Sequence, residues 1–300
     1  MQKTCIIIAG PTAVGKTALA VALAKQYSTH IISADSRQCY RELSIGVAKP
    51  TAEVQQGIPH YFIDSHSIHD NVNAADFETY ALESAATIFK DHDIAIMVGG
   101  TGLYIRAFCQ GMDAMPAIPA PVRDAIITGY QSNGIGWLQD QLKSLDPVYT
   151  AQGEMENPQR MMRALEIVQV TGQSISHFQT GQKKQRDFDI IPICLQLPRE
   201  ALYDRINRRV DMMMEAGLEA EARQLLPHRN LNALQTVGYK ELFDYFDGAI
   251  SLQRAVELIK QNSRHYAKRQ MTWFNREAGM HSCEPNMEAV MKYLREKLPG

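Results

Sequence analysis

Residues 10–17, with the sequence GPTAVGKT, constrain the fold of this chain more than any other feature. They follow an apolar run at residues 5–9 that is typical of a buried strand, and they precede a helical pattern at residues 18–25. A strand, the spacing G-x-x-x-x-G-K-T and a helix form the context that a phosphate-binding P-loop requires. Backbone N–H groups of such a loop converge on an anion at the helix N-terminus. The sequence therefore predicts an α/β core that binds a phosphate compound.

The residues of this loop have distinct expected roles. Lys16 adds a full positive charge, and the hydroxyl of Thr17 can ligate a Mg²⁺ ion that the phosphates also hold. P-loop triphosphatases usually place a metal-positioning Asp at the end of a core strand, but the strand expected at residues 93–98 ends in Val98 and two glycines. We expect Thr17, phosphate oxygens and water to hold the metal, which weakens an ATPase interpretation. The expected phosphate cradle comprises Gly10, Pro11, Thr12, Ala13, Val14, Gly15, Lys16 and Thr17.

Length and composition limit the remaining possibilities. A chain of 300 residues allows one large domain or a core with one insertion, and its 45% hydrophobic and 21% charged residues are typical of a soluble protein. No apolar run reaches the roughly 18 residues of a membrane span, and the first strand begins too early for a secretory signal. Five scattered cysteines argue against a zinc site or a disulfide framework. We therefore expect a cytoplasmic protein without a membrane segment.

Apolar runs and helical periodicity predict a P-loop-type parallel sheet flanked by helices, with an inserted all-helical domain. Residues 1–111 and 188–300 form the expected core, and residues 112–187 form the insertion, which opens with a proline-rich linker. Expected strands are 5–9, 30–34, 59–64, 93–98 and 190–197; expected helices are 18–25, 74–90, 122–130, 137–145, 157–171, 199–216, 240–247, 252–274 and 287–297. The helix at 157–171 is well marked, with Asn157 as N-cap and Gly172 after its end.

Asp35 follows the second strand and should face the same crevice as the P-loop, because ligands bind beyond the carboxyl ends of parallel strands. Arg205, Arg208 and Arg209 are spaced to cluster on one side of the helix at 199–216. Such a cluster is either a solvated face or an anion clamp. Together, the P-loop, Asp35 and the arginines allow two reactions. The first is phosphoryl transfer, with Asp35 accepting a hydroxyl proton. The second is attack by a nucleophile on a substrate from which diphosphate departs.

A basic segment lies near the C-terminus. Residues 254–276 contain six Lys and Arg residues against one acid, Glu257, and Tyr266, Trp273 and Phe274 are interleaved with the charges. A run of charges alone is usually a solvated helix face. Aromatic side chains among the charges raise the odds of a polyanion-binding surface and favour a nucleic-acid co-substrate.

Seven segments in order along the chain resemble the tRNA dimethylallyltransferase family (tRNA isopentenyltransferases, IPP transferase family). Besides the P-loop, they are SADSRQ at 33–38, IGVAKPT at 45–51, VGGTGLY at 98–104, NPQRMMRALE at 157–166, VGYKE at 237–241 and YAKRQMTWF at 266–274. Several are longer and rarer than a P-loop, and together they span almost the whole chain. Departures from the family pattern are few: Cys39, Val47 and Asn275 stand where the family commonly has Val, Thr and Arg.

The resemblance implies transfer of a dimethylallyl group from dimethylallyl diphosphate to N6 of the adenosine 3′ of the anticodon, in tRNAs that read codons beginning with U. It implies Asp35 as general base, Lys16 and Arg209 as diphosphate-binding catalytic residues, Thr17 as the Mg²⁺ ligand, and a tRNA-binding helical insertion. Positions implied to contact tRNA are Asp35, Ser36, Arg37, Gln38, Thr101, Arg123, Gln159, Arg160, Met161, Met162, Arg163, Lys268, Arg269, Gln270 and Trp273.

Three other functions stay open at the level of sequence. An adenylate isopentenyltransferase would prenylate free AMP, ADP or ATP with the same core chemistry, but it needs neither the helix at 157–166 nor the basic segment. A small-molecule P-loop kinase is a second alternative, and a tRNA-binding protein without catalysis is a third. We expect tRNA and dimethylallyl diphosphate as partners of a monomeric enzyme.

Overall fold

The computed structural model describes residues 2–298 and separates into two compact units. One unit, here the P-loop unit, comprises the residues up to Gly111 and those from Gln185 onward. The other, the helical unit, is Met112–Lys184, whereas the sequence analysis extended the insertion to residue 187. Each unit has its own hydrophobic core.

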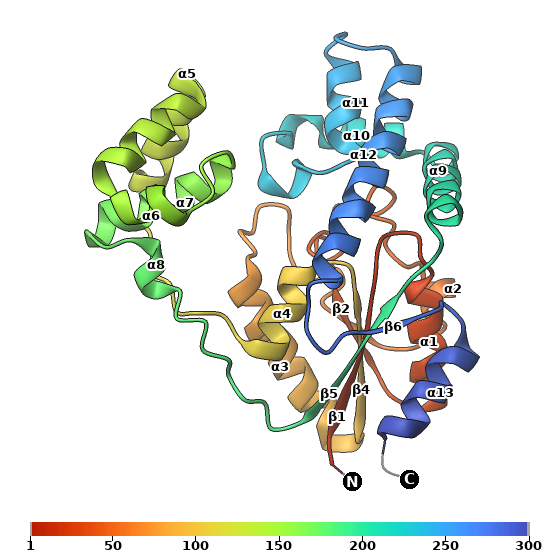
Figure 1. Ribbon diagram of the computed structural model, residues 1–300. Helices are drawn as coiled ribbons and strands as arrows, with labels where there is room; N and C mark the ends of the chain where they lie inside the picture. The colour runs from red at the N-terminus through yellow and green to blue at the C-terminus, as the bar shows by residue number, and fades with distance from the viewer. Residues whose placement is uncertain (1, 299–300) are drawn as a thin grey trace. The chain divides into compact units, whose positions relative to one another are not determined.

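The P-loop unit is built on a parallel sheet of six strands in the order β3-β2-β4-β1-β5-β6 (Figure 1). The strands are β1 Thr4–Ala9, β2 Ile31–Ala34, β3 His60–Tyr61, β4 Ile94–Gly99, β5 Asp189–Leu195 and β6 His281–Cys283. Every residue of β1 is buried, because β4 and β5 pair with its two edges and helices cover both faces. The predicted parallel sheet flanked by helices is confirmed.

Helices surround this sheet. The helices are α1 Lys16–Gln26, α2 Ala52–Gln55, α3 Ala74–Asp91, α4 Gly102–Gln110, α9 Arg199–Glu215, α10 Leu218–Leu225, α11 Tyr239–Phe246, α12 Leu252–Phe274 and α13 Met287–Lys297. Sequence periodicity did not predict α2, α4 or α10, which are only four, nine and eight residues long, or β6, whose three residues carry no alternating pattern.

The helical unit consists of α5 Ala120–Leu145, α6 Pro147–Gln152, α7 Pro158–Thr171 and α8 Ile175–Phe178. Gly134 interrupts α5 with a φ of 74°, which explains why the sequence predicts two helices there. Helix α7 begins as expected, because the side chain of Asn157 accepts hydrogen bonds from the amides of Gln159 and Arg160.

Glu166 of α7 is a buried acid. The helical period places it on one face with Gln159 and Arg163, and its side chain is buried there. Its carboxylate accepts hydrogen bonds from Arg123 Nε at 3.1 Å and from Arg163 Nη1 at 3.0 Å. Two guanidinium groups offset the cost of removing this carboxylate from water.

A buried arginine fixes the return of the chain into the P-loop unit. Arg186 donates from Nη2 to the carbonyl of Ala107 and to the carboxylate of Glu78, and from Nε to the carbonyl of Phe108. The two carbonyls belong to the last turn of α4, where Ala107 also accepts from the amide of Gly111 and carbonyls lack further partners within the helix. The segment entering β5 is therefore attached to the end of α4.

No helix within residues 2–298 combines the length and the apolar character needed to cross a lipid bilayer.

We predict that Gly99→Ala destabilises the protein. A Cβ at this position would lie 2.1 Å from the carbonyl oxygen of Ala34 on the neighbouring strand, so β2 and β4 would have to separate. Overpacking of this kind costs about 2 to 3 kcal/mol, measured as the free energy of unfolding in urea. Gly136→Ala is the control, since a Cβ there meets no atom within 4 Å. Equal unfolding free energies for the two variants would contradict the predicted clash.

Candidate active site

The P-loop leaves the carboxyl end of β1 and enters α1. Gly10 begins the loop with a φ of 146°, and a Cβ there would lie 2.8 Å from the carbonyl oxygen of Leu195 on β5. Gly15 caps α1 with a φ of 110°. Glycine is required at both positions because L side chains rarely adopt these backbone angles. The loop therefore wraps closely around the N-terminus of α1, which favours an anion.

Lys16 folds back over this loop. Its Nζ donates a hydrogen bond to the carbonyl of Pro11 at 2.7 Å. Desolvation, followed by repulsion from Arg209, lowers the pKa of Lys16 to about 8, and attraction from Asp35 opposes the change. The ammonium group is therefore held close to its titration point at neutral to slightly alkaline pH.

Two arginines of α9 reach the P-loop. Arg209 Nη1 donates to the hydroxyl of Thr12 at 3.1 Å, and Arg205 Nη1 donates to the carbonyl of Val14 at 3.2 Å. Arg208 is exposed. The spacing had suggested one cluster of three, but only the residues four apart share the face that meets the loop.

Asp35 stands directly after β2. Its Oδ1 accepts hydrogen bonds from the amides of Arg37 at 2.9 Å and Gln38 at 3.3 Å, which orient the carboxylate. Within residues 2–298, its Oδ2 accepts no hydrogen bond. One oxygen therefore positions the group, and the other remains available to a substrate proton.

Thr101 holds the Asp35 loop, close to Tyr266 of α12. Its hydroxyl oxygen accepts a hydrogen bond from the amide of Ser36 at 3.0 Å, and its amide donates to the carbonyl of Ala34 at 3.2 Å. Burial, followed by repulsion from Asp35, raises the pKa of Tyr266 to about 12. Tyr266 therefore stays neutral beside the Asp35 carboxylate.

Gln270 of α12 joins the C-terminal half of the chain to the P-loop. Its Oε1 accepts from the amide of Thr12, and its Nε2 donates to the carbonyl of Gly100, both at 2.9 Å. These bonds use the amide group of Gln270, which is buried, so the side chain holds the P-loop; its expected contact with tRNA stays a prediction. Lys268 and Arg269, its neighbours, are exposed.

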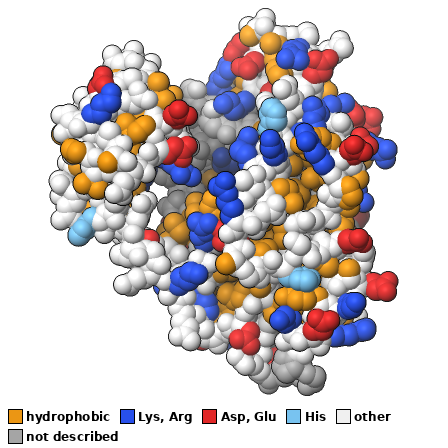
Figure 2. Space-filling model, in the orientation of Figure 1, with side chains coloured by type: hydrophobic (Ala, Val, Ile, Leu, Met, Phe, Trp, Pro, Cys, Tyr) orange, Lys and Arg blue, Asp and Glu red, His pale blue; other side chains and the backbone are white. Residues whose placement is uncertain are grey.

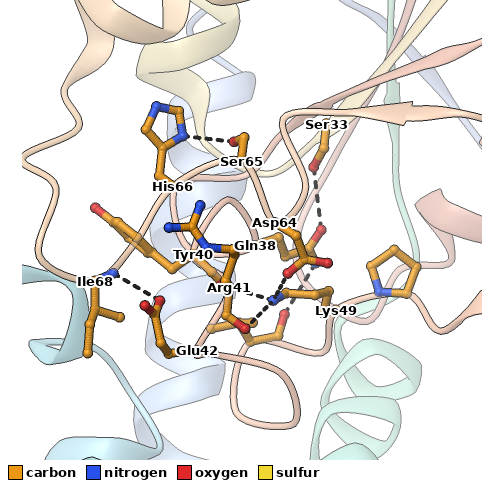
Figure 3. Close-up of polar contacts among 12 residues, drawn as sticks. Ser33, Gln38, Tyr40, Arg41, Glu42, Lys49, Asp64, Ser65, His66 and Ile68 are labelled. Carbon is orange, nitrogen blue, oxygen red and sulfur yellow. Dashed lines mark hydrogen bonds and ion pairs between the residues drawn. The ribbon is translucent and has the colours of Figure 1, made fainter.

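Trp273 and Gln38, two further residues expected to contact tRNA, also contact other residues of the P-loop unit. The indole of Trp273 packs against Gly102 and lies under the guanidinium of Arg106, 4.3 Å from the ring centroid. The side-chain amide of Gln38 donates to the carbonyls of Val47 and Ala48, both at 3.2 Å. Figure 3 shows Gln38 beside Ser33, which donates to its Oε1. Gln38 thus connects the Asp35 loop with residues 45–48.

The candidates of the helical unit divide into surface and core residues. Gln159 and Arg160 are exposed, and Arg160 forms an ion pair with Glu154. The side chains of Met161 and Met162 are 0% and 7% exposed and belong to the core of this unit. Both side chains therefore pack inside this unit, and their expected contact with tRNA stays a prediction. Arg123 and Arg163 are oriented by Glu166.

A cavity of about 570 Å³ in the P-loop unit brings several of these residues together. Thr12, Asp35 and Arg209 line one part of it. Apolar side chains line much of the rest, among them Val47, Ile206, Val210, Met213, Leu218 and Ile259. Ile206, Val210 and Met213 have the spacing of an ordinary core stripe on α9, so sequence alone does not distinguish this cavity wall from a core face.

A metal ion at this site would need oxygen ligands other than a cluster of acidic side chains. The described residues contain no group of three or more His, Cys, Asp or Glu side chains placed to hold a metal ion. Thr17 lies in the first turn of α1, and its hydroxyl has no hydrogen-bond partner within residues 2–298. One hydroxyl together with phosphate oxygens and water is a donor set that suits Mg²⁺.

Comparison with known proteins identifies the family of this chain. The family model described as IPP transferase matches residues 38–277. A tRNA dimethylallyltransferase from Cytophaga hutchinsonii is 47% identical over 99% of this chain and 98% of its own length. One from Bacteroides thetaiotaomicron is 45% identical over 97% of this chain and 95% of its own.

Solved structures give the same assignment. A full-length tRNA isopentenylpyrophosphate transferase from Bacillus halodurans has a TM-score of 0.71 and 37% identity, covering 99% of this chain and 94% of that one. A eukaryotic dimethylallyltransferase acting on tRNA has a TM-score of 0.81 and 25% identity, covering 99% of this chain and 80% of that one. This chain belongs to the IPP transferase family.

Proposed function

We propose that this protein transfers a dimethylallyl group from dimethylallyl diphosphate to N6 of the adenosine 3′ of the anticodon, in tRNAs that read codons beginning with U. One observation carries the proposal: a single cavity joins an anion-binding loop, a carboxylate with a free oxygen, and apolar walls. The relatives named tRNA dimethylallyltransferase support it. The cavity size falls in the range of small-molecule sites, roughly 300 to 1,000 Å³.

The diphosphate of the donor would lie in the P-loop. Amides of residues 13–17 would face its oxygens, and the Lys16 and Arg209 side chains, which both contact this loop, would add positive charge. A Mg²⁺ ion bound at Thr17 would supply further neutralisation of the phosphate charge. These groups would stabilise the negative charge that develops on the departing diphosphate.

Asp35 would act on the acceptor. The exocyclic N6 of adenine is a weak nucleophile, so a proton shared with Asp35 Oδ2 increases its electron density as it attacks C1 of the donor. The N6–C1 bond forms, the C1–O bond breaks, the proton passes to Asp35 and then to solvent, and diphosphate leaves. An adenine stacked in the anticodon loop must be flipped out to reach this carboxylate.

The surface of α12 suits a polyanion. Lys268 and Arg269 are exposed, and Figure 2 shows Lys and Arg side chains gathered over the region of α12 in the P-loop unit. We further propose that the enzyme is a cytoplasmic monomer, consistent with five cysteines that are all free thiols.

A labelling experiment tests the reaction. Radiolabelled dimethylallyl diphosphate and Mg²⁺ are incubated with the protein and either unmodified tRNA or AMP, and label is expected in tRNA. Label in AMP and never in tRNA would contradict the proposal and indicate an adenylate isopentenyltransferase. Transfer of phosphate from γ-labelled ATP to a metabolite would instead indicate a kinase.

We predict that Asp35→Asn leaves tRNA affinity nearly unchanged and lowers kcat about 100- to 10,000-fold, the usual contribution of a general base. Asparagine retains an oxygen for the amides of Arg37 and Gln38, so the loop keeps its shape. The measurement is single-turnover transfer with tRNA and donor in excess over their dissociation constants. Asp93→Asn, at the opposite end of the sheet, is the control. A rate near that of the wild type for Asp35→Asn would remove Asp35 from this role.

We predict that donor affinity falls as pH rises above about 8, because the lowered pKa of Lys16 means that its charge is lost there. Only the protonated lysine attracts the diphosphate, so binding is strongest below this pH and weakens by at most tenfold per pH unit above it. The measurement is the Kd of a non-reactive thiolodiphosphate analogue of the donor. Lys16→Met should bind more weakly, with a Kd that changes only as the analogue itself titrates. If the Kd of the wild type changed with pH in parallel with that of Lys16→Met, a group other than Lys16 would be responsible for the titration.

We predict that Lys268→Ala and Arg269→Ala each weaken tRNA binding and reduce the slope of log K against log salt by about one phosphate contact. Both side chains are exposed, so the fold should tolerate the change. The measurement is tRNA affinity over a series of salt concentrations. Lys292→Ala on α13, also exposed, is the control. Slopes equal to that of the wild type would show that this part of α12 is only a solvated face.

A further inference from the structure

The two walls of the cavity come from distant parts of the chain. Asp35 and residues 46–48 belong to the N-terminal half, and the facing side chains belong to α9–α12. What holds these walls at a fixed separation therefore determines the width of the space available to the donor.

Glu221 of α10 connects the two walls. Its Oε2 accepts a hydrogen bond from the amide of Ile45 at 2.8 Å, and its Oε1 accepts from the amide of Gly46 at 2.9 Å. Oε1 also accepts from the hydroxyl of Tyr239 at 2.6 Å. A carboxylate that receives three hydrogen bonds in this way is a strong and directional attachment point.

Tyr239 completes this attachment from α11. Its side chain is fully buried, and a Cβ added to Gly46 would lie 2.6 Å from its ring. Burial and the neighbouring Glu221 carboxylate raise the pKa of Tyr239, so its hydroxyl remains a hydrogen-bond donor. Residues 45 and 46 are therefore held both by polar contacts and by close packing.

The remaining attachments of this segment come from its own half of the chain. Gln38 holds the carbonyls of Val47 and Ala48, and Lys49 Nζ donates to the carbonyl of Tyr40 at 2.7 Å and to the carboxylate of Asp64 (Figure 3). These contacts shape the segment but do not fix its distance from the opposite wall. Glu221 and Tyr239 do.

We infer that Glu221, supported by Tyr239, is a positioning residue that sets the width of the donor cavity and thereby donor affinity and selection of prenyl chain length. The inference rests on the proposed function. Val47 follows directly after the two amides that Glu221 holds, and Val47 lines the cavity opposite the apolar residues of α9. Loss of the carboxylate would free these amides and let Val47 move outward, which loosens contact with a five-carbon chain and admits a longer one.

The test compares Glu221→Gln and Tyr239→Phe with the wild type in steady-state transfer to tRNA. In Glu221→Gln, the amide nitrogen would face a backbone N–H, so one donor loses its partner. We expect the KM for dimethylallyl diphosphate to rise roughly five- to tenfold, while the KM for tRNA stays within about twofold. Tyr239→Phe retains the ring and should shift the donor KM in the same direction by a smaller factor. The preference for dimethylallyl over geranyl diphosphate, measured as a ratio of kcat/KM values, should fall in both variants.

Glu219→Gln is the matched control, because Glu219 lies on the same helix and pairs with Arg223. A merely structural role would lower the fraction of active enzyme, and hence kcat, without changing the donor KM or the chain-length preference. Unchanged donor KM and preference in Glu221→Gln would overturn the inference. Absence of transfer by the wild-type protein would overturn the proposed function instead, so the two failures are distinguishable.

Discussion

The close approach of β2 and β4 at their carboxyl ends is the constraint on which the site depends. Ala34 pairs with Gly99, and no side chain fits between them. Because β1 pairs with β4 in the same register, Ala9 also lies opposite Gly99. The loops after three strands, which carry the anion cradle, Asp35 and Thr101, therefore begin at one edge of the sheet.

A second set of contacts attaches the C-terminal helices to that edge. Gln270 bonds to the amide of Thr12 and the carbonyl of Gly100, and Arg209 bonds to the hydroxyl of Thr12. Residues more than 190 positions apart thereby define one small volume. The cavity exists because these long-range polar contacts hold α9 and α12 against loops of the N-terminal half. Glu221 of α10 holds residues 45 and 46 of that half in the same way.

Local sequence pattern was sufficient to predict the P-loop, the principal helices and the placement of Asp35 beside the loop, because each depends on a few consecutive residues. It did not predict the contacts of side chains whose partners are distant in the sequence. Gln270 lies in a basic, aromatic segment that suggests an RNA contact, and only the fold reveals that its amide is occupied. Met161 and Met162 lie in a segment that the family resemblance assigns to tRNA, although their helical period already placed them with Leu165 on one apolar face. Glu166 escaped detection because a buried carboxylate is recognised by its partners, not by its sequence neighbours.

The contacts of Arg186 bear on how the insertion can change during evolution. It fastens the segment returning from the helical unit to the last turn of α4, close to where the chain departs at Gly111. The inserted residues thus form a loop whose two ends are secured within the P-loop unit, independently of its contents. Mutation can therefore lengthen, shorten or reshape that insertion without displacing β5 from the sheet, so the helical unit can diversify while the P-loop unit keeps its fold.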